Sequence, residues 1–147
     1  MGCVGERFDG MSEDEMLHTL EEHHRTIRAG LDEIRFQCAA PDPNSGDLDA
    51  ARSRLSSASL ARSKFVSETV VPRLLEHADA DLRDELSKLL SVLQAKRQIS
   101  CAHVTTWTRV TIEADWNGYR TAAALIWTIM ECQIDLERRD LGDRLTP

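Results

Sequence analysis

Long apolar runs, a secretory signal and an excess of basic residues are all absent from this sequence. No stretch approaches the ~18 consecutive apolar residues of a membrane-spanning helix, and residues 1–10 hold no apolar core of the kind that a secretory signal needs. Lys and Arg number 18 against 25 Asp and Glu, which gives a net charge of -7. Because nucleic acids and anionic membranes are bound through basic side chains, we expect no nucleic-acid and no membrane partner.

Cysteine pairs and helix-breaking residues are also scarce. The four cysteines, Cys3, Cys38, Cys101 and Cys132, form no Cys-x-x-Cys pair. Wide spacing without a secretory signal favours reduced thiols, so we expect a cytoplasmic protein. Seven Gly and four Pro leave room for long helices, and 147 residues can bury a core without a metal or disulfide.

The apolar residues recur with the period of helices, and no strand-like alternation competes with them. A capping box over Ser12–Glu15 opens the first helix, and Pro72 is expected to kink or end the second. We expect one domain over 12–141, between a flexible N-terminus (1–11) and a C-terminal tail (142–147). The expected helices cover approximately residues 12–38, 47–77, 80–112 and 116–141.

The first helix carries a seam of apolar residues at alternating spacings of three and four. Its members are Leu17, Leu20, His24, Ile27, Leu31, Ile34 and Cys38. Such a seam is typical of helices that pack side by side, and short connections make successive helices antiparallel. The sequence therefore predicts an all-α fold, an antiparallel up-down-up-down four-helix bundle.

Polar residues interrupt the apolar seams on each expected helix. They are His24, Glu68, His103 and Glu137. Two histidines and two glutamates that converge inside a bundle are the donor set of a carboxylate-bridged metal site. A single histidine on such a seam is usually a core histidine that bonds to a backbone carbonyl or a neighbouring carboxylate, and this interpretation applies to His24 and to His103. Glu68 and Glu137 can equally lie solvated at the edges of their seams. A second register of the second helix turns Arg62 inward and leaves Glu68 at the edge of the seam.

The first two helices resemble those of hemerythrin and the hemerythrin-like (HHE cation-binding) domains. In Glu21–Ile34 the family's first iron-binding histidine falls on His24. Lys64–Glu68, with Pro72 downstream, is similar to the family's second-helix pattern His-Phe-x-x-Glu. Lys64 replaces the histidine of that pattern, and Glu68 matches its bridging glutamate.

The resemblance continues through the last two helices and covers about residues 12 to 141. His103–Val110 fits the third-helix histidine segment, where a further family histidine would be Ile99. Trp116–Glu137 resembles the last helix, with Cys132 at a histidine position and Glu137 at the bridging-carboxylate position.

The resemblance implies a non-haem iron site with a reduced set of ligands. The family holds two irons through five histidines and two carboxylates, and three of these histidine positions are substituted here. The implied metal ligands are His24, Glu68, His103 and Glu137, with Cys132 as a further candidate. Iron in a mono-iron or degenerate di-iron site is one expectation. A metal-free interior is the other, in which the Lys64 ammonium replaces the metal's charge.

Three classes of function follow. The first is a hemerythrin-like protein that binds a metal, a small molecule or a diatomic gas inside the bundle. The second is a metal-free, degenerate hemerythrin fold that binds a partner or a small molecule. The third is an enzyme in which His24 or His103 acts as a general acid or base in the bundle cavity. No nucleophile motif or phosphate-binding loop favours a particular reaction, and the sequence leaves the oligomeric state open.

Overall fold

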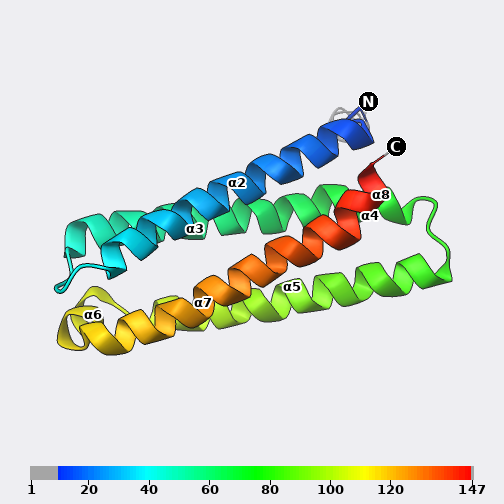
Figure 1. Cartoon of the computed structure of the whole chain (residues 1–147). Coiled ribbons are helices and arrows are strands. Elements are labelled where there is room, and N and C mark those ends of the chain that lie inside the picture. The colour runs from blue at the N-terminus through cyan, green and yellow to red at the C-terminus, as the bar shows by residue number, and fades with distance from the viewer. Residues whose placement is uncertain (1–9, 147) are drawn as a thin grey trace, which may run out of the picture.

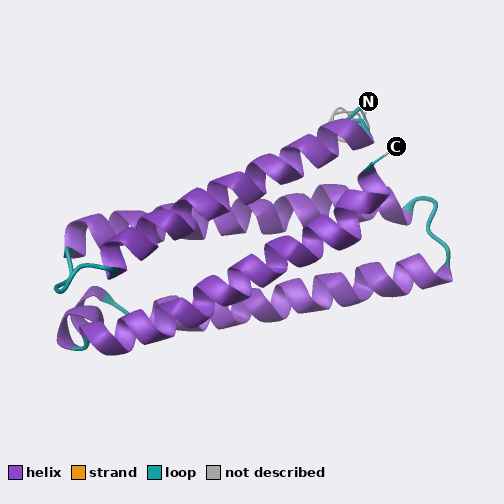
Figure 2. Ribbon diagram, viewed as in Figure 1, coloured by secondary structure: helices purple, strands orange, loops and turns teal. Residues whose placement is uncertain are grey.

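The structure, a computed structural model, describes residues 10–146, and every regular element in that range is helical (Figure 2). The all-helical fold expected from the sequence is thereby confirmed for these residues. The elements are α2 (Glu13–Cys38), α3 (Ser45–Phe65), the π-helical turn η1 (Val66–Val70), α4 (Val71–Leu75), α5 (Ala80–Thr106), α6 (Arg109–Ala114), α7 (Trp116–Glu137), the π-helical turn η2 (Arg138–Gly142) and α8 (Asp143–Leu145).

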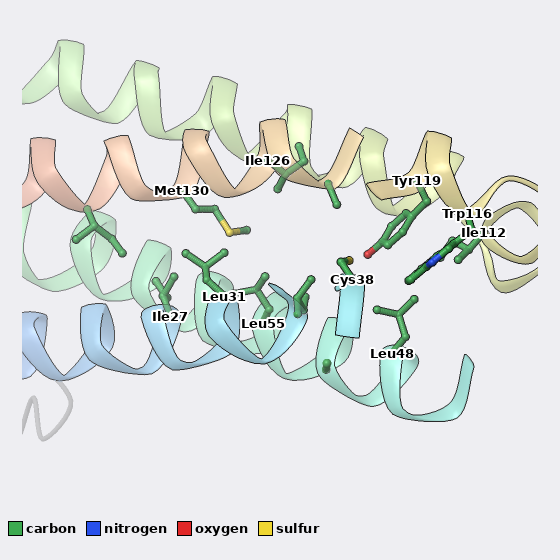
Figure 3. Packing of buried hydrophobic residues seen from close by; sticks show 14 residues of the cluster. Ile27, Leu31, Cys38, Leu48, Leu55, Ile112, Trp116, Tyr119, Ile126 and Met130 are labelled. Carbon is green, nitrogen blue, oxygen red and sulfur yellow. The ribbon is translucent and has the colours of Figure 1, made fainter. Parts of the chain in front are cut away.

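The long helices lie in two pairs, α2 beside α3 and α5 beside α7 (Figure 1). The loop between α2 and α3 and the short helix α6 lie at one end of the molecule. The connection from α4 to α5 lies at the other end, near α8. Side chains from α2, α3 and α7 meet between the pairs (Figure 3).

The first helix follows its sequence signals closely. The Ser12 hydroxyl accepts the backbone N–H of Glu15, and the Glu15 carboxylate accepts the backbone N–H of Ser12, which completes the capping box. Six of the seven expected seam residues are buried, and Leu17 is half-buried while its neighbour Met16 is buried. The buried seam residues are Leu20, His24, Ile27, Leu31, Ile34 and Cys38.

The second helix takes the register that turns Arg62 inward. Arg62 is 3% exposed, whereas Lys64 and Glu68 lie on the surface. Ahead of Pro72 the chain widens into the π-helical turn η1, where the backbone N–H of Val71 bonds to the carbonyl of Val66. Proline disrupts a regular helical turn because it has no N–H and its ring crowds the preceding turn. The distortion expected at Pro72 is therefore a π-helical turn.

Two expected boundaries are wrong. The third helix ends at Thr106 rather than near 112, because Trp107 leaves helical geometry and Thr108 caps the separate helix α6. The expected C-terminal tail is helical to Leu145, whose side chain is fully buried. Of the expected flexible N-terminus, residues 1–9 lie outside the described part of the chain, and Met11 packs against the core.

The buried apolar residues form two clusters along the length of the molecule. One includes Leu31, Leu55 and Met130 (Figure 3), and the other includes Leu20 and Val66. Buried polar residues lie on α2, α3 and α7 between the two apolar clusters. They are His24, Arg62, Gln133 and Glu137.

Candidate functional site

A fully buried carboxylate, that of Glu137, is the centre of this polar network. Its Oε1 lies 2.8 Å from Nε2 of His24 and 3.4 Å from Nη1 of Arg62. Its Oε2 accepts the Nε2–H of Gln133 at 2.6 Å. The amide oxygen of Gln133 in turn accepts Lys96 Nζ at 3.0 Å. Donors from α2, α3 and α7 therefore surround one buried negative charge. Their hydrogen bonds offset the free-energy cost of removing this carboxylate from water.

The network does not fit a di-iron centre. Both oxygens of Glu137 already accept hydrogen bonds, and the guanidinium of Arg62 occupies a position beside Oε1. A cation next to this guanidinium would meet like-charge repulsion in a buried environment. Among residues 10–146, no three His, Cys, Asp or Glu side chains come close enough together to hold a metal ion.

The expected metal ligands lie in different parts of the fold. His24 and Glu137 are brought together, as described above. Glu68 is exposed on η1 and Cys132 is exposed on α7, so neither faces the interior. His103 packs on Tyr119, with ring centroids 5.7 Å apart. Tyr119 and Glu137 are about 27 Å apart along α7 at 1.5 Å per residue, so His103 belongs to a different site. Of the four predicted ligands, the structure therefore brings only His24 and Glu137 together.

A groove lies between α3 and α5 and is also lined by residues of α2 and α7. Its volume is about 400 Å³, and its wall is mostly apolar. α7 forms the floor with Tyr119, Ile126, Trp127 and Met130, and Ile34 of α2 also contributes. Leu60 of α3 and Val104 of α5 line opposite sides of the groove, each 47% exposed. The groove therefore offers apolar surface that remains open to solvent.

The charged groups of the groove are basic. Arg52 and Arg97 line it, together with the hydroxyl groups of Ser56 and Ser59, and no Asp or Glu does. Arg52 lies over the ring of Tyr119, 5.5 Å from its centroid, and its Nη2 is buried without a hydrogen-bond partner in the structure. The chain has a net charge of -7, whereas the charged side chains that line the groove are all basic, so the groove differs in the sign of its charge from the protein as a whole.

His103 is a neutral member of the groove wall at neutral pH. Burial, followed by the charge of Arg52, lowers its pKa to about 4. A base with this pKa accepts a proton weakly at pH 7, which is unfavourable for general base catalysis. Burial likewise raises the pKa of the neighbouring Tyr119 to about 12.

The sequence left the position of Arg62 undecided and did not lead to the groove. The register that turns Arg62 inward was one of two alternatives, and the choice between them depends on how α3 packs against α2 and α7. The groove had a sequence signal that could have been used. Residues 50–67 contain four basic and no acidic residues, namely Arg52, Arg54, Arg62 and Lys64, and residues 86–106 contain Lys88, Lys96 and Arg97 and no acidic residue. Two acid-free helical stretches in an acidic chain predict a shared basic surface.

Free thiols differ in their surroundings. Cys38 is buried, and burial raises its pKa to about 11. Cys101 lines the groove and, like Cys132, is exposed, although both occupy apolar stretches of sequence. Cys3 lies outside the described residues.

None of the helices described here is both long and apolar enough to cross a membrane. Comparison of the chain with protein-family models, with curated proteins and with solved structures finds no match. The groove and the buried network are therefore the features of this chain that bear on its function.

Proposed function

We propose that this chain is a small-molecule-binding protein whose ligand lies in the groove between α3 and α5. The observation that carries the proposal is the groove itself, with a volume of about 400 Å³ and a largely apolar wall. Ligand sites in proteins are concave, mostly apolar and roughly 300–1,000 Å³ in volume, with a few polar groups that orient the ligand. Arg97, Ser59 and Ser100 supply such polar groups here.

The proposal includes the architecture that was expected from the sequence, an antiparallel up-down-up-down bundle of hemerythrin-like type. Its support is the side-by-side arrangement of the long helices (Figure 1) and the pairing of His24 with Glu137. In this view Arg62 supplies the positive charge beside Glu137, the role that the sequence analysis assigned to Lys64. The bundle then holds its polar residues without a metal and binds its ligand in the adjacent groove.

Filling the groove tests this function. Ser56 lines the groove and is exposed, whereas Ser57 is exposed but does not line it. One residue along a helix turns the side chain by about 100°, so Ser56→Phe fills the groove and Ser57→Phe points elsewhere. With 1-octanol as a neutral apolar probe, calorimetric titration should show binding to the unmodified protein and to Ser57→Phe.

Ser56→Phe should weaken that binding about tenfold or more, since the ring takes the volume that the probe occupies. Equal affinity of the two variants for 1-octanol would contradict binding in this groove. If none of the three proteins binds 1-octanol, the proposed function itself is contradicted.

A further inference from the structure

The groove has two chemically different ends. Because α5 runs back along α3, Arg52 of α3 and Thr105 of α5 belong to one end, near α6, and Ser59 and Arg97 belong to the other (Figure 1). The lining residues of each helix span nine positions, a distance of about 12 Å for eight steps of 1.5 Å. An elongated ligand in the groove therefore has a defined orientation available to it.

The end at Arg97 continues into a second, much smaller hollow of about 10 Å³. The two hollows share Ser59, Arg97, Ser100 and Met130. A space of this size holds about one water-sized group, such as a single carboxylate oxygen. The smaller hollow is lined further by Arg62, Lys96, Gln133, Leu93 and Ile129.

Positive charge around this hollow exceeds the negative charge available to balance it. No carboxylate among residues 10–146 forms an ion pair with Arg97, and Lys96 donates to the neutral amide of Gln133. Nε of Arg62, a side chain 3% exposed, has no hydrogen-bond partner in the structure. Glu137 is the neighbouring negative charge, but His24, Arg62 and Gln133 already bond to it and it does not line either hollow.

We infer that the ligand is an amphipathic carboxylate whose charged end binds between Arg97 and Lys96, an inference that rests on the small-molecule-binding function proposed above. The planar guanidinium of Arg97 can donate two parallel hydrogen bonds to a carboxylate, and Lys96 and the hydroxyls of Ser59 and Ser100 add donors. The apolar part of the ligand then extends over Met130 and Ile126 toward Tyr119.

The opposite end is the less suitable place for the charge. Its guanidinium, that of Arg52, lies over the ring of Tyr119, and although Nη2 has no hydrogen-bond partner in the structure, no second cation lines that end. The nearby ring of His103, whose pKa is lowered to about 4, carries no charge at neutral pH. Arg52 thus stands alone as a cation there, whereas Arg97, Lys96 and Arg62 line the smaller hollow together.

Two probes of equal chain length separate the charge from the apolar contact. We would measure the dissociation constants of octanoate and 1-octanol by calorimetric titration at pH 7.5. The proteins are the unmodified chain, Arg97→Gln, Arg52→Gln and Lys88→Gln. Lys88 is the matched control, because it lies exposed on α5, pairs with Asp84 and lines neither hollow.

Octanoate should bind the unmodified protein about tenfold more tightly than 1-octanol, as expected for a charge-assisted hydrogen bond. Arg97→Gln should remove most of this preference for octanoate over 1-octanol, while Lys88→Gln should keep it. Equal affinities of the two probes in the unmodified protein would overturn the inference and leave groove binding intact. A preference lost in Arg52→Gln but kept in Arg97→Gln would overturn the placement of the charge. Failure of both probes to bind would overturn the proposed function instead.

Discussion

At the scale of single residues, the structure distinguishes neighbours that look alike in the sequence. His24 is 1% exposed and bonded to Glu137, whereas His23 is half-buried and lies against Phe65, with ring centroids 5.2 Å apart. We expect His24→Ala to destabilise the fold by about 2–3 kcal/mol, because it removes a hydrogen bond to a buried charge and leaves a cavity. His23→Ala should cost less than about 1 kcal/mol. Urea unfolding of both variants checks this order, and equal losses would mean that His24 is not a structural partner of Glu137.

Arg62 and Lys64 provide a second comparison on one helix. Arg62 is the buried cation beside Glu137, and Lys64 is exposed. Arg62→Met should lower the free energy of unfolding by about 2–3 kcal/mol, since Glu137 then keeps only His24 and Gln133 as donors. Lys64→Met should change it by within about 0.5 kcal/mol. The reverse order in chemical denaturation would restore the register in which Lys64 and Glu68 face the interior.

His103 predicts a pH dependence of stability. Its pKa falls from 6.5 to about 4 on folding, chiefly because burial disfavours the charged ring. Between pH 6.5 and about 4 the unfolded chain therefore binds more protons at this position, so stability should fall as the pH is lowered through that window. The lowered pKa of His23 acts in the same direction.

His103→Gln should lose less stability than the unmodified protein over the same range, measured by thermal unfolding at a series of pH values. An unchanged pH profile in this variant would show that His103 titrates normally in the folded state.

At the scale of helices, boundaries set by local capping were easier to predict than those that depend on packing. Ser12–Glu15 carries the sequence signal for the start of α2, and the capping box forms as expected. The break between α5 and α6 was missed although Thr108 caps α6 by a similar bond, its hydroxyl accepting the N–H of Thr111. The apolar residues Trp107 and Val110 continue the helical spacing beyond Thr106, so the sequence pattern gives no sign that α5 ends there.

The cap at Thr108 can be tested directly. Thr108→Ala should destabilise the protein by about 1 kcal/mol, because it removes the side-chain acceptor for the first turn of α6. Thr106→Ala is the control, since Thr106 is an exposed residue of α5 whose side chain forms no cap. Thermal unfolding distinguishes the two, and equal melting temperatures would mean that α6 contributes little to the cooperative fold.

At the scale of the whole molecule, the helical fold follows from periodicity, but the site does not. His24 and Glu137 were correctly expected to face the interior, because the spacing of apolar neighbours locates their helix faces. The sequence left two registers open for the second helix, one with Glu68 and one with Arg62 toward the interior, and only the packing of α3 decides for Arg62. The groove depends on how far apart α3 and α5 lie, a tertiary property that residue spacing within one helix does not contain.

The distribution of charge over the molecule supports the same view of function. The chain is acidic overall, with 25 Asp and Glu against 18 Lys and Arg, yet the charged residues lining both hollows are all basic. Clefts lined by one sign of charge attract ligands of the opposite sign and exclude others. A basic groove on an acidic protein therefore favours small anions over large polyanions, which the rest of the surface repels.

The most direct test of the central claim is a crystal structure of the protein grown with octanoate. We expect electron density for one octanoate between α3 and α5, with its carboxylate within hydrogen-bond distance of Arg97 and its chain against Met130 and Ile126. Octanoate bound elsewhere, or a groove closed by contact between α3 and α5, would contradict the account.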